Sequence, residues 1–488
     1  MIDKSDAGYA KAMQPRHLQM IAIGGSIGTG LFLGAGGRLA AGGPALAIVY
    51  AVCGFFAFMM VRALGELSIY RPSSGAFVSY AREFMGEKGA YATGWLFFLD
   101  WATTVMADIT AVALYLHFWS VFVPVPQWLL ALVALVLVFT LNMLSVKAFG
   151  EFEFWFAMIK VAAILIFMVV AIGFIVTGHA IDGHPAGFGN LVQDGSVYDG
   201  IFPHGLAPMI TLALGVVFAF GGTEMVGVAA GETRDAARIM PKAINSMIWR
   251  IALFYVGSVI LFTLVMPWTA YSAQESPFVT FFSAIGVPHA GDIMQVVVLT
   301  AALSSLNAGL YATGRTLRSM AVAGSGPRFA KRLNRHQVPS GGIIITASLG
   351  LIGVLINYVY PTQAFDIVMN LAGIGIAGTW MSIMISHWLF VRKAARGEVE
   401  RPAYRLPFAP WTNLATIVFL TAIIVFMWFA DEIGRPTILL GTGIGIIMVA
   451  GWFLVRKRID ATLLDDAFLS GEEELINAED AAAEKWDR

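Results

Sequence analysis

An apolar segment near the N-terminus is interrupted in its middle by glycines and hydroxyl-bearing residues. The segment runs from Met20 to Phe32, and the interruption reads Gly24-Gly25-Ser26-Ile27-Gly28-Thr29-Gly30. In a lipid bilayer every backbone N–H and C=O group needs a partner, so an irregular stretch is tolerated only where it faces protein or a water-filled cavity. We therefore expect a broken membrane helix whose break lines a binding site.

A second interruption of the same kind occurs much later in the chain. It reads Phe218-Ala219-Phe220-Gly221-Gly222-Thr223-Glu224 and again lies inside an apolar run. Paired interruptions are typical of secondary transporters built from inverted repeats, which bind their substrate near the middle of the membrane. The two breaks together predict a transporter.

Composition supports a membrane protein and excludes several other classes. Of the 488 residues, 58% are apolar and only 13% are charged, whereas soluble domains carry about 25% charged residues. A net charge of −1 argues against a nucleic-acid partner. The single cysteine, Cys53, excludes an internal disulfide and a thiolate-rich metal site, and we expect it to be a buried apolar residue.

The hydropathy pattern predicts an all-α protein with twelve transmembrane helices. Apolar segments long enough to cross about 30 Å of hydrocarbon lie near residues 17–40, 43–66, 90–118, 127–146, 152–177, 206–230, 243–268, 290–316, 341–359, 364–391, 411–430 and 436–456. Helices 1 and 6 of this set contain the two breaks.

Positive charges are distributed very unevenly between the expected loops. Of the 31 Lys and Arg residues, only Arg38 and Arg435 fall in expected outer segments, and Arg62, Lys160 and Arg250 fall within spans. The remainder lie in segments on the same side as the N-terminus. Because Lys and Arg collect on the cytoplasmic side, both termini are predicted to be cytoplasmic.

The chain divides into three expected parts. Residues 1–16 form a polar cytoplasmic segment, residues 17–458 the transporter domain, and residues 459–488 an acidic tail that we expect to be disordered. We expect no cleaved signal peptide, because no apolar run followed by a small-residue cleavage site occurs at the start. The histidines of the longest outer loop, His179, His184 and His204, lack the spacing of metal ligands, so no metal site is predicted.

The first break is suited to an anion. Glycines at positions 28 and 30 permit unusual backbone geometry, and a helix that restarts near Thr29 presents unpaired N–H groups at its positive end. A substrate carboxylate is the simplest ligand, held by Ser26, Gly28, Thr29 and Gly30. Two alternatives are a nucleotide loop, which lacks the preceding strand and the following lysine, and glycines that merely allow close helix packing.

The second break is suited to an ammonium group. The half-helix that ends there exposes carbonyl groups at its negative end, formed by Phe220, Gly221 and Gly222. Phe218 or Phe220 is a candidate lid over the substrate, with ordinary packing as the alternative. A carboxylate at one break and an amine at the other predict an amino acid substrate.

Ionisable residues inside spans are costly and usually functional. Lys160 lies about 12 Å into the fifth span, where it could alternate between charged and neutral forms, so it is the best candidate for a proton carrier. The alternative is that its ammonium group reaches the inner surface. Glu224 is a second candidate for coupling, or it binds N–H groups freed by the second break.

Polar residues on the third and eighth spans are candidates for a side-chain pocket. Asp100 lies near the membrane centre and Asp108 nearer the outside. The predicted pocket residues are Asp100, Thr103, Thr104, Ser304, Ser305 and Asn307. For the last three, hydrogen bonding between helices is the alternative.

Two further features of the inner helix ends have simple interpretations. Arg62 and Glu66 are four residues apart, which predicts an ion pair on one helix face. His387 is expected to anchor a helix near the inner surface. No catalytic Ser-His-Asp order and no phosphate-binding loop occurs, so an enzyme is not predicted.

Several motifs in order resemble the bacterial amino acid transporters of the amino acid-polyamine-organocation superfamily. They span residues 15 to about 458 and comprise Gly25-Ser26-Ile27-Gly28-Thr29-Gly30-Leu31-Phe32, Arg62-Ala63-Leu64-Gly65-Glu66-Leu67, Pro72-Ser73-Ser74-Gly75-Ala76-Phe77, Glu151-Phe152-Glu153-Phe154-Trp155 with Lys160, Gly231-Glu232-Thr233 and Gly309-Leu310-Tyr311-Ala312-Thr313-Gly314-Arg315. Residues 75–84 and 108–115 are most similar to the members that transport asparagine.

The resemblance implies a leucine-transporter-type fold, with five helices, five inverted helices and two more. It also implies proton symport with Lys160 as the coupling residue, no cofactor, and import of asparagine or a similar small polar amino acid across the bacterial inner membrane. Membrane lipids are the other expected contact, and no obligate protein partner is inferred. Asp100 departs from the family, where an uncharged residue is expected. Permeases for aspartate, serine, alanine, glycine or 4-aminobutyrate share the framework, and an amino acid sensor is a second class.

Overall fold

The computed structural model describes residues 27–73, 76–144, 146–193, 195–225, 227, 236–336, 338–430 and 433–459. Most of these residues are helical, as predicted. Ser26, the expected N-terminal segment 1–16 and nearly all of the acidic tail 459–488 lie outside the described residues.

The first half of the chain contains both breaks. Its helices are α2 (Thr29–Phe32), α3 (Gly34–Gly42), the 3-10 helix η2 (Gly43–Ala45), α4 (Leu46–Tyr70), α5 (Ala76–Leu116), α6 (Gln127–Leu144), α7 (Val146–Thr177), η3 (Phe188–Leu191), α8 (Val197–Ile201) and α9 (Ala207–Ala219). Between α7 and α8, the short strands β1 (Ala180–Ile181) and β2 (His184–Pro185) pair in antiparallel fashion.

The second half continues with helices only. They are α11 (Ala236–Arg250), the π-helix η4 (Ile251–Gly257), α12 (Ser258–Val265), η5 (Trp268–Ala270), α13 (Pro277–Ala284), α14 (Ala290–Val322), η6 (Arg328–Lys331), α15 (Ser340–Val359), α16 (Ala364–Ala395) and α17 (Trp411–Met427). A final helix covers Gly434–Ile459.

Eight of the described helices are long and apolar enough to cross a membrane. They are Gly34–Tyr70, Phe77–Leu116, Glu153–Thr177, Met240–Val265, Ala290–Val322, Ser340–Val359, Ala364–Ala395 and Gly434–Ile459. Three shorter apolar helices are Gln127–Met143, Ala207–Ala219 and Trp411–Met427. The first of these eight helices, Gly34–Tyr70, combines α3, η2 and α4. The sequence instead predicts two spans in this region, at residues 17–40 and 43–66.

Many apolar side chains on these helices are exposed. Val169 and Val176 on α7 and Leu454 on the last helix are 71%, 80% and 84% exposed. Soluble proteins rarely expose apolar surface of this extent, and large apolar patches mark contact with other molecules or with a membrane. The exposure fits helices surrounded by lipid.

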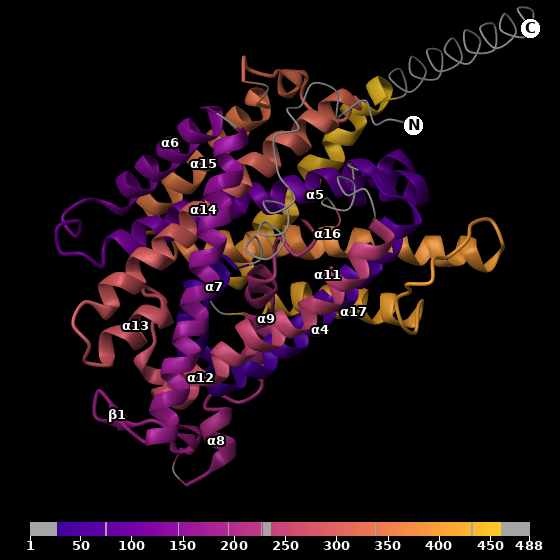
Figure 1. Ribbon diagram of the computed structural model, residues 1–488. Coiled ribbons are helices and arrows are strands. Elements are labelled where there is room, and N and C mark those ends of the chain that lie inside the picture. The colour runs from indigo at the N-terminus through magenta and orange to yellow at the C-terminus, as the bar shows by residue number, and fades with distance from the viewer. Residues whose placement is uncertain are drawn as a thin grey trace, which may run out of the picture.

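The interior is organised around two long helices that pack together, α5 and α16. Figure 1 shows both crossing the centre of the molecule, while β1, α8 and α13 gather at one end. Helix α14 packs against α5, and the short α2 packs against both α9 and α14. The first break therefore lies at the centre of the bundle, beside the end of α9.

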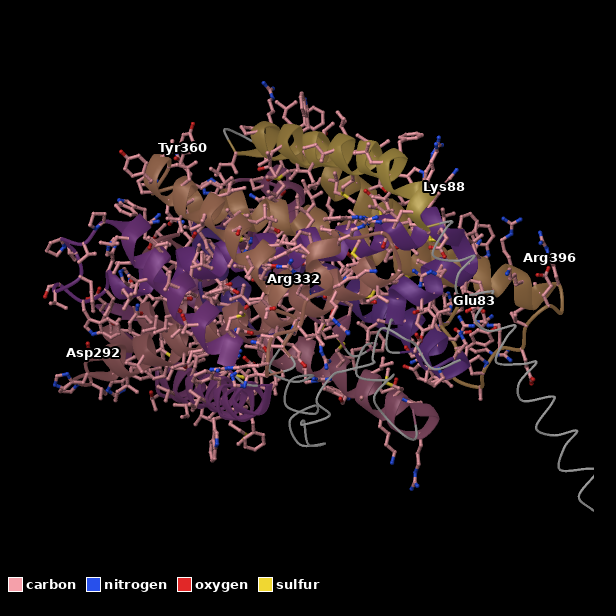
Figure 2. All side chains as sticks on the ribbon, turned by 90° about the horizontal axis from the view of Figure 1, so that it is seen from above. Glu83, Lys88, Asp292, Arg332, Tyr360 and Arg396 are labelled. Atoms are coloured by element: carbon pink, nitrogen blue, oxygen red, sulfur yellow. The ribbon has the colours of Figure 1, made fainter. Side chains whose placement is uncertain are left out.

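Charged residues lie toward both ends of the molecule. Figure 2 shows Glu83, Lys88 and Arg396 at one end and Asp292 and Tyr360 at the opposite end. Lys88 and Arg396 belong to segments that the sequence predicts to be cytoplasmic. Long helices that connect two polar ends through an apolar middle are the arrangement expected of a membrane-spanning bundle.

Candidate functional site

A cavity lies between the start of α2 and the end of α9, at the two predicted breaks. It is lined by Gly28, Thr29 and Gly30 around the start of α2, Asp100, Trp101 and Thr104 on α5, Phe218, Ala219, Gly221 and Gly222 around the end of α9, and Ser305 on α14. All of these except Trp101 and Ala219 are predicted site residues. Segments that are far apart in the sequence thus converge on one space.

The start of α2 forms one wall of the cavity. Gly28 has an extended backbone, with φ of −130° and ψ of −158°, and Thr29 is the first helical residue. Only Leu33, which keeps right-handed helical angles, separates α2 from α3, so residues 29–42 form a nearly continuous helical segment. The first N–H groups of a helix have no partner within it. This wall is therefore suited to a carboxylate.

Gly30 also allows the two broken helices to approach each other closely. A Cβ atom at this position would lie 2.5 Å from the Cα atom of Ala219, so a larger residue requires the helices to separate. The alternative predicted for these glycines, close helix packing, therefore applies to Gly30. It is compatible with a binding role, because the same contact brings the start of α2 to the end of α9.

The opposite wall is the end of α9 and the turn that follows. Gly222 has φ of +86°, a conformation that glycine adopts easily and other residues rarely. The carbonyl groups of Phe218 and Phe220 accept hydrogen bonds from the N–H groups of Gly221 and Thr223, at 3.0 and 3.3 Å. Each carbonyl oxygen has a second lone pair, so this negative helix end can also accept from an ammonium group.

The two candidate lid residues lie in different surroundings. Phe218 lines the cavity. The ring of Phe220 is wholly buried and packs on Tyr255 and Tyr50, with ring centroids 4.7 and 6.0 Å away. Phe220 therefore packs against aromatic residues outside the cavity, and Phe218 is the candidate lid residue that lines the cavity.

Asp100 brings a carboxylate to the third wall. Its side chain is 2% exposed, and one oxygen accepts a hydrogen bond from the Thr104 hydroxyl at 3.5 Å. The other oxygen has no hydrogen-bond partner. Thr103 does not line the cavity, because its hydroxyl donates to the Leu99 and Asp100 carbonyl groups of its own helix.

The polar residues of α14 point in two directions. Ser305 lines the cavity. Ser304 and Asn307 instead donate hydrogen bonds to Glu153 on α7, at 2.8 and 3.1 Å, and Asn307 also accepts from Asn142 on α6 at 2.7 Å. The alternative of hydrogen bonding between helices therefore describes Ser304 and Asn307, and they are not part of the cavity wall.

Lys160 is buried and is not among the residues that line the cavity. Its side chain is 1% exposed, so it does not reach the inner surface, and it faces the carboxylates of Glu153 and Asp108. Asp108 accepts a hydrogen bond at 2.8 Å from the Thr29 hydroxyl. Asp108, to which the sequence assigned no role, is thus hydrogen-bonded to the first residue of α2 and lies within electrostatic reach of the predicted proton carrier.

Glu224 supports the second break. One of its oxygens accepts from the Gly222 N–H group at 3.1 Å, and the other from the Trp380 indole at 3.3 Å. These bonds fit the alternative predicted for Glu224, which is to bind N–H groups of the unwound segment. Glu224 also lies within electrostatic reach of Asp100.

The predicted ion pair between Arg62 and Glu66 is wrong. Glu66 is buried, and both of its oxygens bind the Arg401 guanidinium, at 2.7 and 3.1 Å. It also pairs with His387 at 2.9 Å and with the Leu406 N–H group at 2.6 Å. Arg62 instead donates to the Arg405 carbonyl and Asn245. Helix spacing allows the pair, but the loop between α16 and α17 supplies a better partner.

We expect Glu66→Ala to lower the free energy of unfolding by about 3 to 5 kcal/mol, because it leaves the Arg401 guanidinium without its bidentate partner. Thermal unfolding of the purified protein in detergent measures the change. The control is Glu87→Ala, which removes a more exposed ion pair with Arg82 and is expected to cost about 1 kcal/mol or less. Equal losses in the two variants would contradict a buried role for Glu66.

The cavity is small in this conformation. Its volume is about 20 Å³, and one water molecule needs about 10 to 15 Å³ in the same measure. An amino acid is much larger. Substrate can occupy this position only if the surrounding helices move apart.

Comparisons with known proteins agree with this arrangement. The amino acid permease family model matches residues 17–463. The chain is 57% identical to the L-asparagine permease of Streptomyces coelicolor over 94% of this chain and 93% of that protein. It is 54% identical to the L-asparagine permease of Escherichia coli over 94% and 91% of the two chains, and 51% identical to L-asparagine permease 2 of Mycobacterium tuberculosis over 94% of each. The chain is therefore a member of the amino acid permease family.

Proposed function

We propose that this protein is a secondary active permease that imports L-asparagine, or a similar small polar or neutral amino acid, together with protons. The observation that carries the proposal is the cavity between the broken helices, which combines a helix start, a helix end and a buried carboxylate. The relatives named L-asparagine permease support asparagine as the substrate.

The two breaks bind the common part of an amino acid. The substrate carboxylate binds at Gly28, Thr29 and Gly30, with Ser26 as a further ligand. The amine binds carbonyl groups around Gly221 and Gly222, and Phe218 closes over the substrate. The proposal is supported by the contact of Gly30 with Ala219, which holds the two oppositely charged helix ends at a short separation.

Asp100 favours an amide over a carboxylate on the substrate side chain. Its unpartnered oxygen is an acceptor, and the amide NH₂ group of asparagine supplies the donor that it lacks. The side chain of aspartate would instead bring a further negative charge next to Asp100 and near Glu224, at a cost in a site of low dielectric constant. Thr104, Ser305 and Trp101 complete this part of the pocket.

We expect Asp100→Asn to change the preference among asparagine, aspartate and alanine by about tenfold, equivalent to about 1.4 kcal/mol. The physical reason is the loss of an acceptor for the asparagine amide and of repulsion against aspartate. Competition by unlabelled amino acids against labelled asparagine measures the ranking. The control is Thr103→Val, which alters a neighbouring side chain outside the cavity wall and should keep the ranking of the parent. An unchanged ranking in Asp100→Asn would exclude Asp100 from substrate selection.

The small size of the cavity supports a mechanism of alternating access. We propose a leucine-transporter-type arrangement of twelve helices, in which residues 17–458 form five helices, five inverted helices and two more. Movement of one set of helices against the other opens the cavity to each side in turn. The asymmetry of Lys and Arg supports cytoplasmic termini in a bacterial inner membrane. The proton is the coupling ion, and no cofactor takes part.

Uptake by the full chain in proteoliposomes tests the proposal. We expect labelled L-asparagine to accumulate when the exterior is more acidic than the lumen, and to equilibrate without accumulation when the pH is equal on both sides. Stronger competition by serine, alanine, glycine, aspartate or 4-aminobutyrate than by asparagine would identify another substrate. Binding without any uptake would instead favour an amino acid sensor.

A further inference from the structure

Asp108 is a buried carboxylate that the proposed function does not use. It lies on α5, eight residues beyond Asp100, and its side chain is 0% exposed. One oxygen accepts the hydrogen bond from the Thr29 hydroxyl at 2.8 Å, and the Ser305 hydroxyl lies within hydrogen-bonding reach of the same carboxylate. Asp108 thus binds the hydroxyl group of Thr29 and lies near the hydroxyl group of Ser305, which belongs to a different helix.

Thr29 and Ser305 connect Asp108 to the cavity. Thr29 and Ser305 both line the cavity, whereas Asp108 does not. Thr29 is the first residue of α2, so its position determines where the N–H groups at the helix start point. A change at Asp108 therefore reaches the carboxylate end of the site without direct contact with substrate.

Lys160 on α7 lies within electrostatic reach of Asp108. The remaining titratable groups of this neighbourhood are Tyr115 on α5, which lies within electrostatic reach of Asp108, and Glu153, which faces Lys160. In an interior of low dielectric constant, a carboxylate is stabilised strongly by a facing ammonium group. The charge of Lys160 therefore acts on Asp108.

The hydrogen bonding of Asp108 differs from that of the buried carboxylates with structural roles. In the described part of the chain, Glu66, Glu153 and Glu224 are hydrogen-bonded through both oxygens. Asp108 has one buried oxygen without a hydrogen-bond partner. A carboxylate that only ties helices together is expected to be fully satisfied. The unsatisfied oxygen is a place where a proton or a cation can be received.

We propose that Asp108 is a positioning residue that transmits the charge state of Lys160 to the carboxylate end of the substrate site through Thr29 and Ser305. While Lys160 carries its proton, the ammonium group neutralises Asp108. When the proton leaves, the uncompensated carboxylate attracts its donor, the Thr29 hydroxyl, and the nearby Ser305 hydroxyl more strongly. The start of α2 then shifts, and affinity for the substrate carboxylate changes with it. This inference rests on the proposed proton coupling by Lys160.

The test compares Asp108→Asn with the parent by measuring the apparent KM for asparagine uptake across a range of external pH. We expect the parent KM to vary with pH, and the Asp108→Asn KM to become nearly independent of pH while exchange at equal pH persists. Thr29→Val removes the hydroxyl that donates a hydrogen bond to Asp108, so its KM should also become nearly independent of pH. Thr29→Ser keeps the hydroxyl, so its KM should vary with pH as that of the parent does.

A double-mutant cycle distinguishes failure of this inference from failure of the proposed function. If Asp108 acts through Lys160, adding Asp108→Asn to Lys160→Ala should change KM by less than about twofold, because coupled residues are not additive. A parent-like pH profile in both Asp108→Asn and Thr29→Val would overturn the inference while leaving proton coupling intact. Accumulation by Lys160→Ala would instead overturn the proposed coupling.

The control for loss of a buried hydroxyl is Thr313→Val. The Thr313 hydroxyl on α14 donates only to carbonyl groups of its own helix, those of Gly309 and Leu310. This variant should retain the pH profile of the parent. If Asp108→Asn does not fold, judged by its elution from size exclusion, the Thr29→Val and Thr29→Ser pair decides the question by itself.

Discussion

Lys160→Ala should abolish accumulation of asparagine against its gradient while leaving part of the exchange activity. The side chain is 1% exposed, so its charged form is costly in the apolar interior and depends on the facing carboxylates of Glu153 and Asp108. Removing it takes away the proposed titrating group. The backbone groups proposed to bind the substrate carboxylate and amine remain in place.

The experiment uses proteoliposomes under two conditions. With equal pH on both sides and preloaded substrate, we expect Lys160→Ala to exchange labelled asparagine at a reduced rate. With an acidic exterior, the ratio of internal to external substrate should stay near one, whereas that of the parent should exceed it. Lys457→Ala makes the same chemical change at an exposed lysine and should accumulate substrate as the parent does. Accumulation by Lys160→Ala would move the proton site to Glu224 or Asp100.

The sequence predicted the structure well where the backbone conformation requires particular residue types. Glycines inside an apolar run are costly in a helix, so they indicated both breaks. The structure begins α2 at Thr29 and ends α9 at Ala219, within the predicted interruptions. Trp101 and Ala219 also line the cavity, but neither stands out in the sequence, because an aromatic or an alanine in a membrane helix is ordinary packing.

Side-chain direction was harder to predict than helix position. Ser304 and Ser305 are adjacent, yet one binds Glu153 and the other lines the cavity, because neighbouring residues on a helix point about 100° apart. Which of the two faces the cavity depends on how α14 is rotated against α5 and α7. Contacts among all three helices determine that rotation, so it cannot be predicted from the sequence of α14 alone.

The clearest error, the predicted ion pair between Arg62 and Glu66, arose because Glu66 binds a residue from a distant segment. Arg62 and Glu66 have ideal spacing for a pair on one helix, but such surface pairs contribute only a few tenths of a kcal/mol. The bidentate contact of Glu66 with Arg401 joins residues 335 positions apart and is much stronger when buried. A prediction from i,i+4 spacing therefore fails where a loop folds back over a helix end and supplies a stronger tertiary contact.

Substitution of the glycines at the first break should have the other large effect on binding, and the two positions should fail for different reasons. At Gly28 the backbone is extended, and a Cβ atom would lie 3.4 Å from the Ser305 hydroxyl oxygen. An alanine therefore fits the fold but narrows the cavity. We expect Gly28→Ala to weaken asparagine binding by tenfold or more, about 1.4 kcal/mol, with little loss of stability.

At Gly30 a Cβ atom would lie 2.5 Å from the Ala219 backbone, which cannot move without separating α2 from α9. We expect Gly30→Ala to lose binding and to lower the unfolding temperature together. Thermal unfolding with and without asparagine measures both, because a ligand that binds only the folded protein stabilises it by RT ln(1 + L/Kd), where L is the free ligand concentration. Gly445→Ala, at a helical position with no atom within 4 Å, should behave as the parent does. If Gly28→Ala is stabilised by asparagine as strongly as the parent, the substrate carboxylate does not bind at this break.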